Sequence, residues 1–171
     1  MEEIDPESYQ IREVYAHFGL AIYCAQCVEQ AIIQNLIFFD YFPDAIESTP
    51  DAETWTERFD EFEAGEMRRT MGMLIKRLRK EGQTTEAIEQ RLDDVLAKRN
   101  WLAHRYFDDR AVEFTLIEGR ATMVKELEMI QAQFREAEDL IADVTRPVAI
   151  KYGLTDEVLA QTMTDLVSKH K

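Results

Sequence analysis

Apolar residues recur at helical spacing, every three or four positions, along most of this chain. The pattern predicts four long helices, over about residues 9–40, 54–81, 85–108 and 121–145, and a short last helix that follows Thr155. No repeat, low-complexity tract or linker interrupts the series. Long helices joined by short connections predict an all-α fold, an antiparallel four-helix bundle with an additional short C-terminal helix, in a single domain over residues 1–171.

Proline, glycine and threonine mark the expected element boundaries. Pro43 is expected to stop the first helix and to begin a loop over residues 43–52. Residues 111–117 alternate weakly and predict a short extended segment, and Glu118-Gly119 predicts a turn. Pro147 is expected to end or kink the fourth helix. The other cap signals are Gly82, Thr85, Tyr152-Gly153 and Thr155.

The stretch from Lys98 to Asp108 breaks the apolar pattern of the third helix. Arg99 occupies the next position due on the apolar stripe after Val95, where a charged group is costly without a partner. Glu29 of the first helix could face Arg99 across the bundle. Arg99 and His104 are five residues apart, about 140° around an ideal helix. A buried ion pair, a polar interface and a functional site all remain open explanations.

The segment from Arg99 to His104 resembles the signature of HEPN domains, which is an arginine, a polar residue, three more residues and a histidine. With Tyr106 they resemble the longer form found in HEPN toxins that are paired with a minimal nucleotidyltransferase antitoxin. The resemblance implies a four-helix fold and a homodimer whose two motifs meet in one cleft. It also implies ribonuclease activity, although some members keep the fold without catalysis. In the resembled toxins the partner transferase attaches AMP to the tyrosine that corresponds to Tyr106.

The same residue types suit RNA cleavage without a metal, in which the substrate's own 2′-OH attacks the adjacent phosphate. His104 is the candidate for proton transfer near neutral pH, and Arg99 for charge stabilisation. The candidate supporting or substrate-binding residues are Asn100, Tyr106, Arg105 and Lys98, and Arg110 is a further cation nearby. The predicted function is a metal-independent endoribonuclease, of a toxin–antitoxin or antiphage defence system. The alternative is a non-catalytic helical module that grips a nucleotide or a protein partner.

A homodimer is expected for two further reasons. The run from Leu36 to Phe39 is apolar on all sides, which predicts burial by another element or by a second chain. A two-fold axis beside the motif would also bring Arg99 and His104 of different copies together.

Charge narrows the range of partners. The chain has a net charge of −14, and residues 1–66 carry all of it, with 16 acidic and 2 basic side chains. An acidic surface argues against broad, non-specific nucleic-acid binding but leaves room for a local cationic site. Away from the motif, basic residues cluster on the second predicted helix, and a solvated helix face is the simpler interpretation of this cluster. It is formed by Arg68, Arg69, Lys76, Arg77, Arg79 and Lys80.

Cys24 and Cys27 have the spacing of a redox or metal motif, and His17 lies on the same predicted helix face as Cys24. A fourth ligand and a βαβ unit are both missing, so buried reduced thiols are expected, and neither a metal nor a cofactor. None of His17, His104 and His170 follows a glutamate by three residues, which excludes a di-metal carboxylate bundle. Without a membrane-length apolar run or a signal-like N-terminus, a cytoplasmic location is expected.

Overall fold

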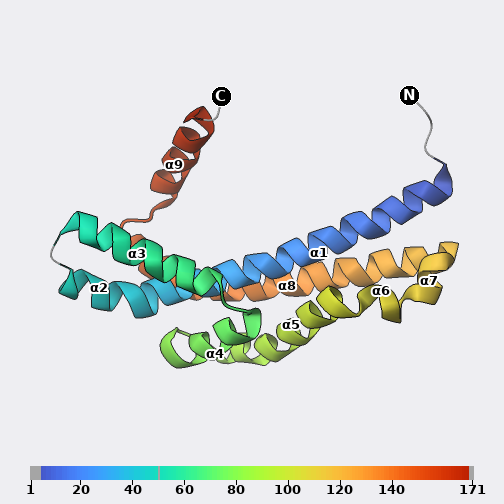
Figure 1. Cartoon of the computed structure of the whole chain (residues 1–171), viewed down its shortest axis with the longest axis horizontal. Helices are drawn as coiled ribbons and strands as arrows, with labels where there is room; N and C mark the ends of the chain where they lie inside the picture. The colour runs from blue at the N-terminus through green and yellow to red at the C-terminus, as the bar shows by residue number, and fades with distance from the viewer. Residues whose placement is uncertain (1–4, 50, 170–171) are drawn as a thin grey trace.

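Helices make up all the regular secondary structure that is described. The computed structural model describes residues 5–49 and 51–169, so His170 lies outside it, and no strand occurs within these ranges. The all-α prediction is confirmed (Figure 1). In chain order the elements are α1 (Pro6–Leu36), the π-helical turn η1 (Ile37–Tyr41), α2 (Phe42–Ser48), α3 (Ala52–Met67), α4 (Met71–Glu81), α5 (Glu86–His104), α6 (Tyr106–Asp109), α7 (Ala111–Thr115), α8 (Ile117–Lys151) and α9 (Asp156–Lys169).

The two longest helices, α1 and α8, lie side by side and make the most extensive helix–helix contact in the molecule (Figure 1). They run parallel. Arg120 donates to Gln10 near the start of both helices, with 3.2 Å between Nε and Oε1, and Asn35 donates to Thr145 near their ends, with 3.0 Å between Nδ2 and Oγ1. A simple up-and-down bundle would make the first and last long helices antiparallel, so the expected antiparallel alternation is wrong for this pair.

α5 is antiparallel to α1 and to α8. Arg99 lies opposite Glu29, whereas Tyr106, later in the chain, lies opposite Phe18, which is earlier. The contacts with α8 also run in opposite chain directions. Arg91 contacts Glu136, whereas Arg110, later in the chain, contacts Glu126, which is earlier in α8. The motif helix therefore packs along a platform made by α1 and α8.

The sequence predicted that the first helix stops at Pro43, and this prediction is wrong. The helix widens into the π-helical turn Ile37–Tyr41, and α2 then carries Pro43 in its first turn, where a proline needs no N–H partner. Helix therefore replaces most of the loop expected over residues 43–52. The apolar run from Leu36 to Phe39 packs inside the chain, and Phe38 stacks on Tyr152 with ring centroids 6.0 Å apart. This run therefore needs no second chain to cover it.

The second predicted helix is two helices. α3 ends at Met67, and Thr70 begins α4 as its N-cap by accepting from the backbone N–H of Met73. Thr70 is a typical N-cap residue that the continuous apolar pattern conceals. This break adds a reversal of direction between the first and last long helices, which is consistent with the parallel pairing of α1 and α8.

The region after the motif is helical as well. The expected extended segment over residues 111–117 is instead the short helix α7, and α8 begins at Ile117, so the turn predicted at Glu118-Gly119 is also wrong. Pro147 lies inside α8 and does not end it. It is exposed, so the carbonyl that loses its helical partner one turn earlier can meet water.

The predicted caps at Gly82, Thr85, Gly153 and Thr155 are confirmed. Gly82 is the C-cap residue of α4, and Thr155 accepts from the backbone N–H of Val158 at 3.4 Å at the start of α9. Thr85 accepts from the backbone N–H of Ile88 at the start of α5. Gly153 has φ +91° and follows Tyr152, the C-cap residue of α8, and the N–H of Leu154 donates to the carbonyl of Ala149 at 3.0 Å. α9 then extends away from the body (Figure 1), and all of its residues are exposed.

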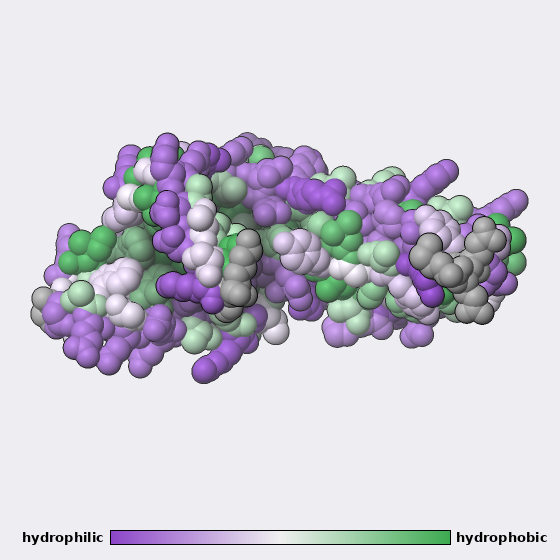
Figure 2. Space-filling view, turned by 90° about the horizontal axis from the view of Figure 1, so that it is seen from above, coloured by the Kyte–Doolittle hydropathy of each residue, from purple (hydrophilic) through white to green (hydrophobic). Residues whose placement is uncertain are grey.

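Hydrophilic side chains cover most of the face shown in Figure 2, and hydrophobic ones emerge there in separated groups. The core lies between α1, α4, α5 and α8. None of the helices in the described ranges is long and apolar enough to cross a membrane.

Candidate functional site

The motif occupies the C-terminal half of α5, which ends at His104. Arg105 leaves the helical conformation, with φ −137° and ψ −11°, while its N–H still donates to the carbonyl of Trp101 at 2.9 Å. The chain resumes as α6 at Tyr106, which is 1% exposed. The buried tyrosine fixes the chain directly after this break, and His104 therefore lies at a defined helix end.

Arg99 faces inward, as its position on the stripe predicted. Its Nε lies 3.3 Å from Oε1 of Glu29 on α1, and the two side chains are 31% and 20% exposed. The partner suggested from the sequence is therefore present. This geometry supports a half-buried ion pair that holds α5 against α1.

Asn100 and His104 lie on the outer face of α5, one turn apart, and both are exposed. Neither side chain makes a hydrogen bond or ion pair with another residue in the described parts of the chain. One copy of the chain therefore presents His104 to solvent together with Asn100, and it does not bring His104 and Arg99 together.

Tyr106 is part of the core. Its ring packs against Phe18, Trp101 and Phe107, and its hydroxyl donates to the carbonyl of Met123 at 3.4 Å. Burial, with a smaller contribution from Glu126, raises the pKa of this hydroxyl well above its ordinary value. Because Tyr106 is buried, its hydroxyl is out of reach of RNA or a transferase in this conformation.

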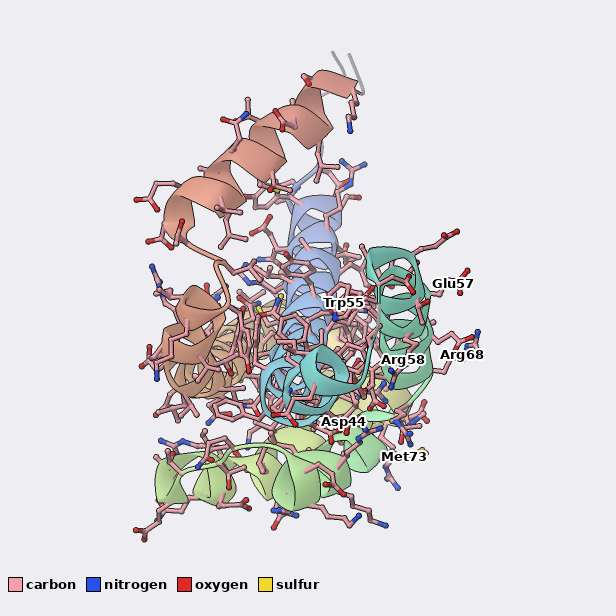
Figure 3. The ribbon with its side chains drawn as sticks, turned by 90° about the vertical axis from the view of Figure 1, so that its left-hand side faces the viewer. Asp44, Trp55, Glu57, Arg58, Arg68 and Met73 are labelled. Atoms are coloured by element: carbon pink, nitrogen blue, oxygen red, sulfur yellow. The ribbon has the colours of Figure 1, made fainter. Side chains whose placement is uncertain are left out.

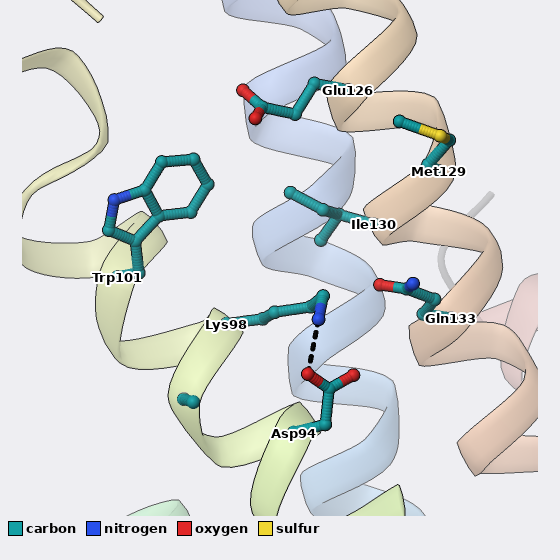
Figure 4. Close-up of a pocket in the computed structure, with 8 residues that line it drawn as sticks. Asp94, Lys98, Trp101, Glu126, Met129, Ile130 and Gln133 are labelled. Carbon is teal, nitrogen blue, oxygen red and sulfur yellow. Dashed lines mark hydrogen bonds and ion pairs between the residues drawn. The ribbon is translucent and has the colours of Figure 1, made fainter. Parts of the chain in front are cut away.

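The cations around the motif are paired with carboxylates. Lys98 pairs with Asp94 (Figure 4), and Arg105 donates to Asp109 at 2.9 Å. A hydrogen bond to Asp109 raises the pKa of Arg105. Arg110 makes two contacts with Glu126, at 2.9 and 2.6 Å, and these pairs reduce the local positive potential. Arg105 keeps the most exposed side chain of these cations, at 69%.

A cavity of about 420 Å³ opens between α5 and α8 beside the motif (Figure 4). From α5 it is lined by Ala97, Lys98 and Trp101, with Asp94 one turn earlier. Sequence reasoning missed it because the opposite wall depends on how α8 packs against α5. The one available signal was the spacing of Ala97, Trp101 and His104, which puts a large aromatic side chain on the outer side of α5.

The basic cluster on α3 and α4 is mostly part of an ion-pair network. Arg77 contacts Asp40 of the π-helical turn at 2.5 Å and also the buried Glu66. Arg69 lies 3.0 Å from the other oxygen of Glu66. Arg68, in contrast, is exposed and points away from the body (Figure 3). These pairs connect α4 to α3 and to η1, so this cluster offers less free positive charge than its composition suggests.

Cys24 is buried, Cys27 is half-buried, and both are free thiols. Burial raises the pKa of the Cys24 thiol. Gln131 of α8 donates to the backbone carbonyl of His17 at 3.0 Å and lies 3.4 Å from its Nδ1, so His17 takes part in the contact between α1 and α8. Within residues 5–49 and 51–169, no three His, Cys, Asp or Glu side chains are grouped as a metal site would require.

Comparisons of the chain with family models, with curated proteins and with solved structures find no match. Inferences about function therefore rest on the residues of this chain and on their geometry.

Proposed function

We propose that this protein is a metal-independent endoribonuclease of HEPN type that acts as a homodimer on RNA. The observation that supports it is the position of His104 at the end of α5, exposed and one turn from the exposed amide of Asn100. A general base must reach the proton that it removes, and an open helix end allows a flexible RNA strand to approach. The predicted role of His104 is to accept the proton of the 2′-OH while O2′ attacks phosphorus and the bond to O5′ breaks.

The developing phosphorane needs positive charge, and two arginines can supply it in this proposal. Arg105 follows His104 directly and is largely exposed, so it meets the phosphate first. Arg99 contributes only when substrate or a second copy of the chain displaces it from Glu29. Asn100 orients His104 or donates to a phosphate oxygen. Lys98 directly precedes Arg99, at the start of the motif. Tyr106 supports the helix end from the core.

A non-catalytic binding module is the second candidate, and one observation favours it. The Arg99–Glu29 pair is what a structural role predicts, and some members of the resembled family keep the fold without catalysis. In either case the resemblance suggests a role in a toxin–antitoxin or antiphage defence system with a nucleotidyltransferase antitoxin. Modification of Tyr106 by such a partner would require local opening around the buried hydroxyl.

Incubation of the purified protein with single-stranded RNA and a chelator separates the two candidates. The ribonuclease proposal predicts cleavage, whereas a binding module predicts retarded but intact RNA. Gln90→Ala is a matched control, because Gln90 is an exposed polar residue near the start of the same helix and should leave cleavage unchanged. Light scattering at micromolar concentration tests the dimer, and a monomer that cleaves RNA would contradict that part of the proposal.

A further inference from the structure

The cavity between α5 and α8 lies on the same side of α5 as His104. Ala97 and Trp101 line it, and His104 follows Trp101 by three residues and Ala97 by seven, which are the spacings of one helix face. His104 lies about 4.5 Å beyond Trp101 along the helix axis, at a rise of about 1.5 Å per residue. His104 does not itself line the cavity, but it lies less than one helical turn beyond Trp101, which does.

Trp101 is held in a fixed orientation. Its indole N–H donates to Oδ2 of Asp109 at 2.8 Å, and its ring makes a T-shaped contact with Tyr106, with 5.0 Å between the centroids. The guanidinium of Arg110 lies 5.0 Å from the ring centroid. Ile130 and Met129 of α8 extend the apolar part of the cavity wall (Figure 4). A preorganised aromatic ring with apolar neighbours is suited to stacking on a flat heterocycle.

The cavity also contains a polar atom without a partner. Oε1 of Gln133 is buried, and it receives no hydrogen bond from any residue that the structure describes. A buried acceptor left unsatisfied is costly, so a ligand that offers a donor there gains affinity. The nearby Lys98 ammonium is already engaged by Asp94 (Figure 4). Lys98 does not donate to Oε1 of Gln133 in this structure, so a ligand in the cavity could supply the donor.

We propose that this cavity binds one base of the RNA substrate, a base that carries an exocyclic amino group, with the base stacked beside Trp101. This inference rests on the proposed ribonuclease function. The amino group donates to Oε1 of Gln133, and the ribose points toward His104. The volume of about 420 Å³ is within the range of small-molecule sites and accommodates a single base. Cytosine, adenine and guanine have such an amino group, whereas uracil has only a ring N–H.

Cytidine 3′-monophosphate and uridine 3′-monophosphate form a matched pair of probes, because at C4 one has an amino group and the other an oxygen. The chain has two tryptophans, Trp55 and Trp101, so Trp55→Phe leaves Trp101 as the only reporter. We expect the cytidine nucleotide to quench Trp101 fluorescence and to bind about 3- to 10-fold more tightly than the uridine nucleotide. If Trp55→Phe unfolds, the same titration is followed on the wild-type protein through the two indole N–H signals in NMR spectra.

Gln133→Leu should remove the preference for cytidine, because leucine fills similar space without an acceptor. Gln90→Leu, on the exposed side of α5, should leave the preference intact. Equal affinities for the two nucleotides, or no response of Trp101 to either, would overturn the inference. RNA cleavage without this preference would overturn the base site and leave the ribonuclease proposal standing. A cytidine preference that depends on Gln133, in a protein that cleaves no RNA, would support the site and contradict the ribonuclease.

Discussion

Arg99 of α5 and Glu29 of α1 form an ion pair, with 3.3 Å between Nε and Oε1, on the side of α5 that is turned away from His104. The pair accounts for a charged residue on an apolar stripe. It also holds Arg99 away from His104, which lies about 140° around the helix, although the resemblance to HEPN domains depends on both residues. In one copy of the chain, one of them connects helices and the other faces solvent.

The Arg99–Glu29 pair should contribute to stability. Because both side chains are partly exposed, Arg99→Ala is expected to cost about 1–3 kcal/mol, less than a fully buried pair and more than a surface one. The double change with Glu29→Ala should cost less than the sum of the single changes. Arg91→Ala, which removes a surface pair with Glu136, is the control and should cost under about 1 kcal/mol. Urea unfolding measures all four variants, and additive costs would show that the pair is not coupled.

The ring of Tyr106 should contribute much more to the stability of the fold than its hydroxyl does. Tyr106→Phe loses one long hydrogen bond, which predicts a loss of about 0.5–1.5 kcal/mol with helicity unchanged. Tyr106→Ala empties a site in the core and should cost about 3–5 kcal/mol. Thermal unfolding compares the two. A large loss of RNA cleavage in a stable Tyr106→Phe protein would show that the hydroxyl takes part in function.

Substitution of glycine by alanine should have opposite effects on stability at two positions. A Cβ on Gly19 would meet nothing within 4 Å, so Gly19→Ala should stabilise α1 by about 0.5–1 kcal/mol. A Cβ on Gly119 would lie 2.6 Å from the Cα of Glu113, so Gly119→Ala should force α7 and α8 apart and cost about 1–3 kcal/mol or more. Equal shifts in the unfolding midpoint would contradict this packing of α7 on α8.

The hydrogen bond from Trp101 to Asp109 should be visible in a pH titration. Hydrogen bonds from Arg105 and then from Trp101 lower the pKa of Asp109. The folded state is therefore favoured by this group above the ordinary Asp pKa of about 3.9, and that contribution is lost as the pH falls through the lowered value. In the Trp55→Phe protein, Trp101 fluorescence should stay constant down to about pH 4 and change only below it.

Asp109→Asn is the control for this titration and should abolish the step. Circular dichroism over the same range verifies that the helices remain folded. A midpoint at or above the ordinary Asp value would contradict the hydrogen bonds to Asp109.

The periodic positions predicted the helices, and local chemistry predicted some of their ends. Thr85 and Gly153 could be assigned because each cap depends on one residue and its immediate neighbours. Pro43 misled the prediction, because a proline in a first turn is compatible with a helix. Of the two alternatives for Pro147, an end of the helix is wrong, because this proline lies inside α8. Thr70 was missed since the apolar pattern continues across the break.

The site was predictable only as far as a single helix determines it. Helix geometry gave the separation of Arg99 from His104, and the apolar stripe suggested Glu29 as a partner. The unsatisfied oxygen of Gln133 could not be predicted, because it depends on how α8 packs beside α5. The burial of Tyr106 depends in the same way on three helices that meet at one ring.

Analysis of the RNA ends tests the central claim most directly. Single-stranded RNA is incubated with wild-type protein or with His104→Ala in the presence of a chelator, since in-line attack needs a backbone freed from A-form stacking. We predict 5′ fragments that end in a 2′,3′-cyclic phosphate, formed about 10²- to 10⁴-fold more slowly by His104→Ala, which should stay as stable as the wild type because His104 is exposed. Intact RNA with the wild-type protein, or equal cleavage by the two proteins, would contradict the proposal.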